Sequence, residues 1–520
     1  MVSLMKPFID KQFFIPIILF ICAYAILSFN LSEQGPHSDE LDFFYAFSNV
    51  YFNLFKNGDF FNPCWNGNGE CTLISVKECN MQDHWVGMHG VVKHLMVGLG
   101  AVIHGIDYSK SYAPEPPLCK PHNDPLPGIN VPTKSELTAA RFFSPILGSL
   151  TVVIAFVIGK ILFNRIVGIS FGLLLLFNSL WFAYNRTIMT EAYIYFFMML
   201  SFLLLLYSVR EKEKIGYPLL VLSAIIFGIA FDTKAIVFMF LPLFLGIIFL
   251  RGLFNEKLSK KSFQTPKYLS KSIILAATYV GIFFVAIIVT LPFYWIGPFE
   301  QIMFQRESLN AYTTGMSLNM PWEANKIHVR FMSTITVTIA PIIDVYYYFV
   351  TNDIPESLKF ANNFSSVPLT ILFVTGLIYT ISSVRNKRIT GSELLIIFWF
   401  ISVFVLMSTM NKSYSPSRFY VMMFLPIFLI AAYGYHRFFS ILKNKYLGIF
   451  SLGLTISAHA ITTLIFWDKL FFQPSIIWSD PLMVKSQVAI GHPEVLILSA
   501  IFMIFFVIFG IKKIKIKTRV

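Results

Sequence analysis

Residues that can carry out acid, base or electrostatic chemistry occur in this sequence at the edges of long apolar segments. Asp39 and Glu40 form an adjacent pair of carboxylates about ten residues after the first apolar segment. A carboxylate can accept a proton from a hydroxyl group, and a cation can stabilise the negative charge that grows on a phosphate. Groups of both types stand at the other edges: His89, Lys93, Arg186, Glu191, Asp232, Lys234 and Arg418.

Each of these residues also has a purely structural interpretation. A charge at the end of a membrane helix commonly marks the interface and extends to water, which accounts for Arg186 or Arg418 taken singly. Asp39 and Glu40 can begin a solvated loop, and a single histidine such as His89 is more often a packing or surface residue than a metal ligand. The chemical interpretation is favoured because all these groups fall on one face of the membrane, where they can meet a lipid phosphate and a sugar.

The elements that position these residues are membrane helices. The 520 residues are 56% hydrophobic and 13% charged, which is too apolar for a soluble protein and typical of a polytopic membrane protein. A helix needs roughly 20 apolar residues to cross the hydrocarbon core. We therefore predict an all-α fold of about twelve membrane helices in a single domain, 1–520, with spans near 13–29, 142–163, 166–182, 192–209, 217–232, 235–250, 272–294, 365–384, 392–410, 419–435, 447–467 and 494–511.

Basic residues predict how these spans are oriented. The net charge of +13 is spread through the short links between spans, as the enrichment of Lys and Arg in cytoplasmic links requires, and it forms no stripe for nucleic acid. Both termini are then cytoplasmic, and a plasma or cytoplasmic membrane is expected. The outer or luminal face carries two long loops, 30–141 and 295–364, and all four N-x-S/T triplets. An apolar stretch at 335–350 is predicted to be re-entrant or to lie on the surface.

The first outer loop is predicted to carry short helices. The run "MHGVVKHLMVGLGAVIHG", which contains His89 and Lys93, is amphipathic, and we predict a helix along the outer leaflet.

Several of these stretches, in their order, resemble a known family. "SDELDFFYAFSNVYFNLFKNGDF" is followed by "HGVVKHLMVGLGAVIHG", "ARFFSPILGSLTVVIAFVIGKILF", "NRTIMTEAYIYFF" and "GIAFDTKAIVFMFLPLF". This order resembles the N-terminal half of GT-C glycosyltransferases, in particular the protein O-mannosyltransferases and the lipid A aminoarabinose transferases. The resemblance covers roughly residues 30–250, with a weaker similarity at "SRFYVMMFLPIFLIAAYG". It implies a GT-C fold and a sugar donor carried on a polyprenyl phosphate such as dolichyl phosphate.

The resemblance also implies roles for individual residues. Asp39 matches the acidic residue of the family's first-loop motif and is the expected general base, with Glu40 as its neighbour. Glu191 stands where the family usually has Asp in "R-x-x-x-x-D", and Lys234 matches the lysine that meets the carrier phosphate. His89 matches the His of "HPPL", although Gly and Val replace both prolines here. The expected catalytic set is Asp39, Glu40 and Glu191, and the expected phosphate-binding set is Lys234, His89, Lys93, Arg186 and Arg418.

The implied reaction is a single displacement with inversion at the anomeric carbon. No nucleotide-binding fingerprint is present, and no cofactor or metal is obligatory, because the leaving group is already a lipid phosphate; a divalent metal is not indicated. The acceptor, whether protein, lipid or glycan, stays open, and membrane lipids are expected partners. Three alternatives remain: an oligosaccharyltransferase, which would carry a WWD triplet; a transporter or flippase, which would place charges near the bilayer midplane; and a non-catalytic scaffold.

The cysteines give the first testable prediction. Cys64, Cys71, Cys79 and Cys119 all fall in the first outer loop, with no CxxC pair that would favour zinc. Two disulfides are therefore expected, in one of three pairings. Intact-mass analysis after alkylation without reductant should show these four thiols unlabelled, and labelling of all four would rule the disulfides out.

Overall fold

The structure, a computed structural model of the chain, is helical throughout the part that it describes. The described residues are 14–33, 40, 46–62, 65, 91–107, 133–210, 216–254, 266–295, 297–300, 303, 307, 367–386, 389–410, 421–442 and a few between 446 and 457. Within these ranges no strand occurs, and three helices are long and apolar enough to cross a membrane. The prediction of an all-α polytopic membrane fold is thereby confirmed.

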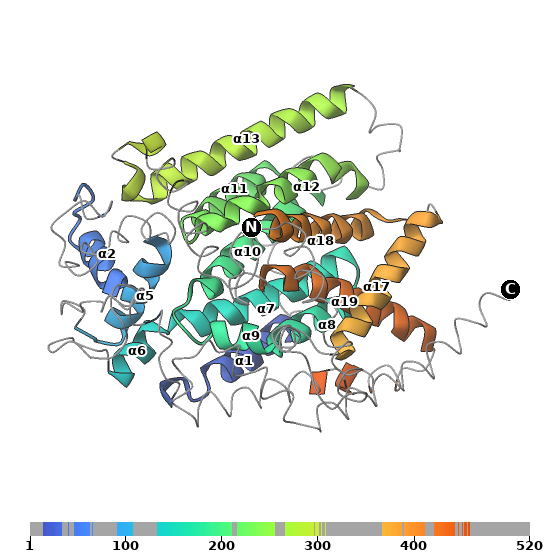
Figure 1. The fold of residues 1–520 in the computed structure, drawn as a ribbon, viewed down its shortest axis with the longest axis horizontal. Helices are drawn as coiled ribbons and strands as arrows, with labels where there is room; N and C mark the ends of the chain where they lie inside the picture. The colour runs from blue at the N-terminus through green and yellow to red at the C-terminus, as the bar shows by residue number, and fades with distance from the viewer. Residues whose placement is uncertain are drawn as a thin grey trace, which may run out of the picture.

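The centre of the fold is helix α7 (Phe143–Leu162), which packs against α1 (Phe14–Ser28), α8 (Arg165–Leu176) and α10 (Thr190–Arg210) (Figure 1). Helices α7 and α8 are joined by a tight turn, because Asn164 caps α8 by accepting hydrogen bonds from the amides of residues 166 and 167. They also approach closely, since a Cβ on Gly168 would lie 2.4 Å from the carbonyl oxygen of Phe156.

The predicted span at 166–182 is wrong in one respect, because the structure divides it. Helix α8 ends at Leu176 and a short helix, α9 (Ser179–Tyr184), follows. Asn178 separates the two helices, and its side chain accepts a hydrogen bond of 3.0 Å from the amide of Trp181. Asparagine prefers such a capping position to a helix interior, so the apolar run does not continue as one helix.

A second layer of helices covers α10. It contains α11 (Tyr217–Phe231), the 3-10 turn η5 (Ala235–Phe240), α12 (Leu241–Phe254) and α13 (Pro266–Thr290), and α11 packs between α10 and α13. The buried rings of Phe202, Phe227, Phe244 and Tyr279 form the core of this layer. A stripe of exposed apolar residues runs along α13, as expected of a helix that faces lipid.

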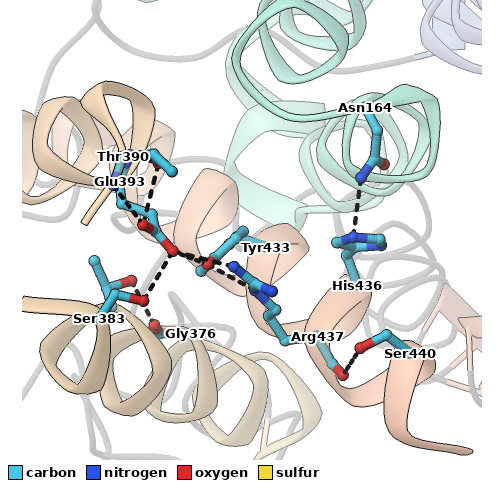
Figure 2. A network of polar contacts seen from close by, with 10 residues as sticks. Asn164, Gly376, Ser383, Thr390, Glu393, Tyr433, His436, Arg437 and Ser440 are labelled. Atoms are coloured by element: carbon cyan, nitrogen blue, oxygen red, sulfur yellow. Dashed lines mark hydrogen bonds and ion pairs between the residues drawn. The ribbon is translucent and has the colours of Figure 1, made fainter. Parts of the chain in front are cut away.

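The C-terminal helices are α17 (Val367–Arg385), α18 (Gly391–Met410) and α19 (Val421–Leu442), and α19 packs against both α17 and α8. Glu393 ties the three together (Figure 2). One of its oxygens accepts a hydrogen bond from the Thr390 amide at the start of α18. The other accepts hydrogen bonds from Ser383, Tyr433 and Arg437. Asn164 and His436 join α19 to the turn between α7 and α8.

The first outer loop carries three short helices within its described part, as predicted: α2 (Ala46–Lys56), α5 (Val91–Ile103) and α6 (Lys134–Ala140). Helix α5 packs against α2 and α6 beside the end of the bundle (Figure 1). A capping box at Thr133 and Glu136 begins α6. The predicted spans at 447–467 and 494–511 and the stretch 335–350 lie largely or wholly outside the described residues.

Candidate functional site

Four of the described candidate residues, Glu40, Arg186, Glu191 and Lys234, lie at one end of the bundle, which we call the site end. It is formed by the C-terminal ends of α1, α11 and α13 and by the N-terminal ends of α7 and α10. Alternating helix directions bring these chain ends to one side. The candidates that the structure describes are Glu40, Lys93, Arg186, Glu191 and Lys234. Those outside the described residues are Asp39, His89, Arg418 and the cysteines Cys64, Cys71, Cys79 and Cys119.

Glu40 is fully buried at the site end and is held by three hydrogen bonds. Arg141 donates to both of its oxygens, from Nε at 2.9 Å and from Nη2 at 2.6 Å. The amide of Ile188 donates to Glu40 Oε1 at 2.8 Å. This two-pronged ion pair is of the strong, charge-assisted kind, and it fixes the start of the first outer loop against α7 and against the α9–α10 turn. The lone pairs of Glu40 are therefore largely engaged.

Arg186 lies in the α9–α10 turn and is buried next to this pair. It donates hydrogen bonds to the last carbonyl groups of α1, at 2.8 Å to Leu27 and 3.3 Å to Ile26, and its guanidinium lies 4.9 Å from the centre of the Phe182 ring. The favourable dipole of a helix C-terminus accounts for the first contacts. Burial, with a contribution from the nearby Arg141, lowers the pKa of Arg186 to about 9, so it remains a cation at neutral pH.

Glu191 and Lys234 form an ion pair. The sequence identified both residues as candidates but did not predict that they contact each other. Lys234 Nζ lies 3.4 Å from Glu191 Oε1, and both side chains are largely buried. Glu191 begins α10, and Lys234 stands at the start of η5, just after α11. The second carboxylate oxygen, Glu191 Oε2, is buried and has no hydrogen-bond partner among the described residues. A buried acceptor of this kind is costly to leave unpaired, which is typical of a functional site.

Asp232 is a further buried carboxyl group at the site end, in the turn between α11 and Lys234. Its Oδ2 shares a hydrogen bond with the hydroxyl of Thr290, the last residue of α13. Its Oδ1 is buried and has no partner in the described part of the chain. Burial raises the pKa of the Asp232 carboxyl well above its usual range, and the contact with Thr290 offsets only part of this.

Lys93 is brought to a different place from Lys234. It is fully buried on α5, beside His94, whose Nδ1 lies 2.9 Å from the hydroxyl of Ser48 on α2. The ring of Tyr51 packs against His94 and against Trp65. Lys93 thus lies in the interior of the first outer loop, on a helix that packs against α2 and α6.

Arg141 is the site residue that sequence reasoning missed. It is the C-cap residue of α6, just before α7 begins, in "ARFFSP", and its partner Glu40 is 101 residues earlier in the chain. A basic residue on the face where topology predicts few of them was the available signal. Among the described residues, no group of three His, Cys, Asp or Glu side chains lies close enough to hold a metal ion.

Comparison with known proteins supports the resemblance stated from the sequence. Residues 126–305, about a third of the chain, match the family model described as dolichyl-phosphate-mannose-protein mannosyltransferase. This segment contains Arg141, Arg186, Glu191, Asp232 and Lys234. The predicted resemblance to the protein O-mannosyltransferases is confirmed over that segment, while no curated protein matches the chain.

Solved structures of low identity are also similar to the chain. The Saccharomyces cerevisiae protein O-mannosyltransferase Pmt1-Pmt2 complex bound to the sugar donor is 16% identical, with a TM-score of 0.38 over 57% of this chain and 34% of that one. ArnT from Cupriavidus metallidurans in the apo state is 11% identical, with a TM-score of 0.45 over 94% and 76%. The Archaeoglobus fulgidus oligosaccharyltransferase is 11% identical, with a TM-score of 0.47 over 93% and 56%. The chain thus spans only about a third of the yeast protein and just over half of the archaeal one.

The Glu40–Arg141 pair generates a prediction about stability. Arg141→Ala leaves the Glu40 carboxylate buried without its cation, which costs about 3–5 kcal/mol, so the unfolding temperature of the purified protein should fall clearly. Adding Glu40→Gln to Arg141→Ala removes the unpaired charge and should recover part of the loss, as measured by thermal unfolding in one detergent. Equal unfolding temperatures for Arg141→Ala and wild type would contradict the role assigned to this pair.

Proposed function

We propose that this chain is an integral-membrane glycosyltransferase that moves a sugar from a polyprenyl-phosphate carrier to an acceptor hydroxyl group. The transfer takes place on the outer or luminal face and inverts the anomeric carbon. The observation that carries the proposal is the buried Glu191–Lys234 pair at the site end, inside the segment that matches the family of mannosyltransferases. The acceptor is a protein, lipid or glycan hydroxyl.

The chemistry of the donor explains why a cation is needed here. The bond that breaks joins the anomeric carbon to a phosphate oxygen, so negative charge grows on the lipid phosphate in the transition state. Lys234 carries three donor protons on a flexible chain, and Glu191 Oε1 is its ion-pair partner at 3.4 Å. In the proposed reaction Lys234 turns some of these protons to the phosphate, with Glu191 keeping its ammonium group in place. Arg186 adds a fixed positive charge to the same end of the bundle.

Asp39 is the proposed general base. The acceptor hydroxyl must lose a proton as it attacks, and a carboxylate beside the anomeric carbon can take it. Glu40 is poorly suited to this task, because Arg141 and the Ile188 amide already occupy its oxygens. Successive residues of a helix point about 100° apart, so only one member of the pair can take the role of base. In this proposal Glu40 is the anchor that holds Asp39 at the site.

The role of Lys234 is tested by two substitutions. Lys234→Ala should weaken use of the donor, seen as a higher KM for a polyprenyl-phosphosugar. Lys234→Arg keeps the charge but changes its shape, so it should retain part of the activity. Steady-state transfer assays with purified protein measure both. Equal activity of Lys234→Ala and wild type would return Lys234 to the role of an interface residue.

The role of Asp39 is the most direct test of the proposed function. Purified protein is incubated with a panel of polyprenyl-phosphosugars and candidate acceptors, and the products are identified by mass spectrometry. Asp39→Asn keeps the size of the side chain but removes the base, so transfer should fall by at least about a hundredfold while the donor still binds.

Glu40→Gln is the matched control for Asp39→Asn, and it should reduce transfer less. A near wild-type Asp39→Asn enzyme together with an inactive Glu40→Gln enzyme would reverse the assignment within the pair. Full activity of both would show that the first outer loop is not the catalytic centre. If wild-type protein transfers sugar from no donor in the panel, the proposed glycosyltransferase activity is contradicted.

A further inference from the structure

Asp232 is the one buried carboxyl group at the site end that the proposed reaction does not yet use. It is 1% exposed and lies two residues before Lys234, in the turn that joins α11 to η5. Among the described residues, its side-chain partner is Thr290 on α13, and its second oxygen has no partner there. No described cation forms an ion pair with Asp232, whereas Lys234 pairs with Glu191.

Burial and the shortage of described partners assign the protonation state of Asp232. Thr290 donates its single hydroxyl proton toward Asp232 Oδ2 and toward the carbonyl oxygen of Ala286, which lies 2.8 Å away, so among the described residues the carboxyl group receives only a share of one hydrogen bond. Its other oxygen, Oδ1, has no partner in the described chain. An uncompensated buried carboxylate is costly, and neutralisation removes that cost.

We propose that Asp232 is a positioning residue that is neutral in the donor-binding form of the protein and sets the charge of the phosphate site around Lys234. This inference rests on the proposed function and extends it. Glu191 and Lys234 cancel each other in charge, so a neutral Asp232 leaves the site able to take one phosphodiester anion. An ionised Asp232 adds a negative charge beside Lys234 and competes for its ammonium group, which weakens binding of the same anion.

Few other described groups near Asp232 could make donor binding depend on pH. Among the described residues, α10 brings Glu191 to this part of the site end and α13 brings Thr290, while η5, which begins after Lys234, packs against α11, α12 and α18. The sign then follows. Donor binding needs the protonated form, so affinity is full below the pKa of Asp232 and is lost as the pH rises through it. Because burial raises that pKa, the loss falls above the range where an ordinary carboxyl titrates.

The first measurement is infrared spectroscopy of the whole purified protein in lipid nanodiscs, which does not depend on catalysis. Wild type should show the carbonyl stretching band of a protonated carboxylic acid at neutral pH, and Asp232→Asn should lack it. Thr290→Val should shift this band without removing it, because only the hydrogen-bond partner is lost. Glu393→Gln is the matched control: Glu393 accepts hydrogen bonds from Arg437 and three other residues, so it is ionised and its replacement leaves the band unchanged.

The second measurement is equilibrium binding of a radiolabelled polyprenyl-phosphomannose, without acceptor, over a range of pH. The phosphodiester keeps one charge throughout, so it does not titrate itself. For wild type the apparent Kd should rise by up to about tenfold for each pH unit above the pKa of Asp232. Asp232→Asn mimics the neutral acid, since it is uncharged and its amide oxygen can accept the hydrogen bond from Thr290, and its Kd should stay at the low-pH value of wild type.

Three outcomes would overturn the inference. An infrared band that is unchanged in Asp232→Asn means that Asp232 is ionised. Identical pH profiles of Kd for wild type and Asp232→Asn mean that its proton is not linked to the donor. A Kd for Asp232→Asn far above that of wild type at low pH means that the negative charge is needed. Failure of wild type to bind or use any polyprenyl-phosphosugar counts against the proposed function, whereas the infrared result still decides the proton on Asp232.

Discussion

Charge buried at the end of a helix bundle must be neutralised, and this constraint shapes the site end of the protein. Six ionisable side chains lie there largely out of water: Glu40, Arg141, Arg186, Glu191, Asp232 and Lys234. Burying one charge alone costs far more than the few kcal/mol by which a protein is stable, so each needs a partner or a proton. Glu40 forms an ion pair with Arg141, and Glu191 forms one with Lys234. Arg186 donates hydrogen bonds to carbonyl groups at the C-terminal end of α1.

These charged groups differ in how many of their polar atoms are hydrogen-bonded. The difference separates the structural ion pair from the proposed reactive site. Both oxygens of Glu40 are engaged, which locks the beginning of the first outer loop onto α7 and α10. Glu191 and Asp232 each keep one buried oxygen without a partner in the described chain. A structural ion pair is most stable when all of its acceptors are hydrogen-bonded. A site that binds and releases a charged lipid, in contrast, needs polar atoms that are not already hydrogen-bonded within the protein. The proposed assignment of Glu40 as anchor and Lys234 as phosphate ligand follows this difference.

Much of this arrangement could be predicted from the sequence, and the rest depends on tertiary contact. Apolar length predicted α10 and α13, and the order of motifs identified Glu191 and Lys234 as site residues before their ion pair was known. The pairing of Glu40 with Arg141 crosses 101 residues and leaves no local pattern, so it could not be predicted. The break between α8 and α9 at Asn178 was missed for a different reason. Average hydropathy over an apolar run does not reveal a single side chain that caps a helix. The role of Asp39 stays a prediction, because that residue lies outside the described part.

The opposite end of the bundle tests whether buried charge by itself marks a functional site. Glu393 is as buried as Glu191 and also has a cationic partner, Arg437. Its two oxygens, however, accept from Thr390, Ser383, Tyr433 and Arg437, and the network joins α17, α18 and α19 (Figure 2). With no acceptor left over, Glu393 can hold helices together but has little left to offer a ligand. Burial and an ion pair are therefore common to both ends, and it is the unsatisfied oxygens of Glu191 and Asp232 that distinguish the site end.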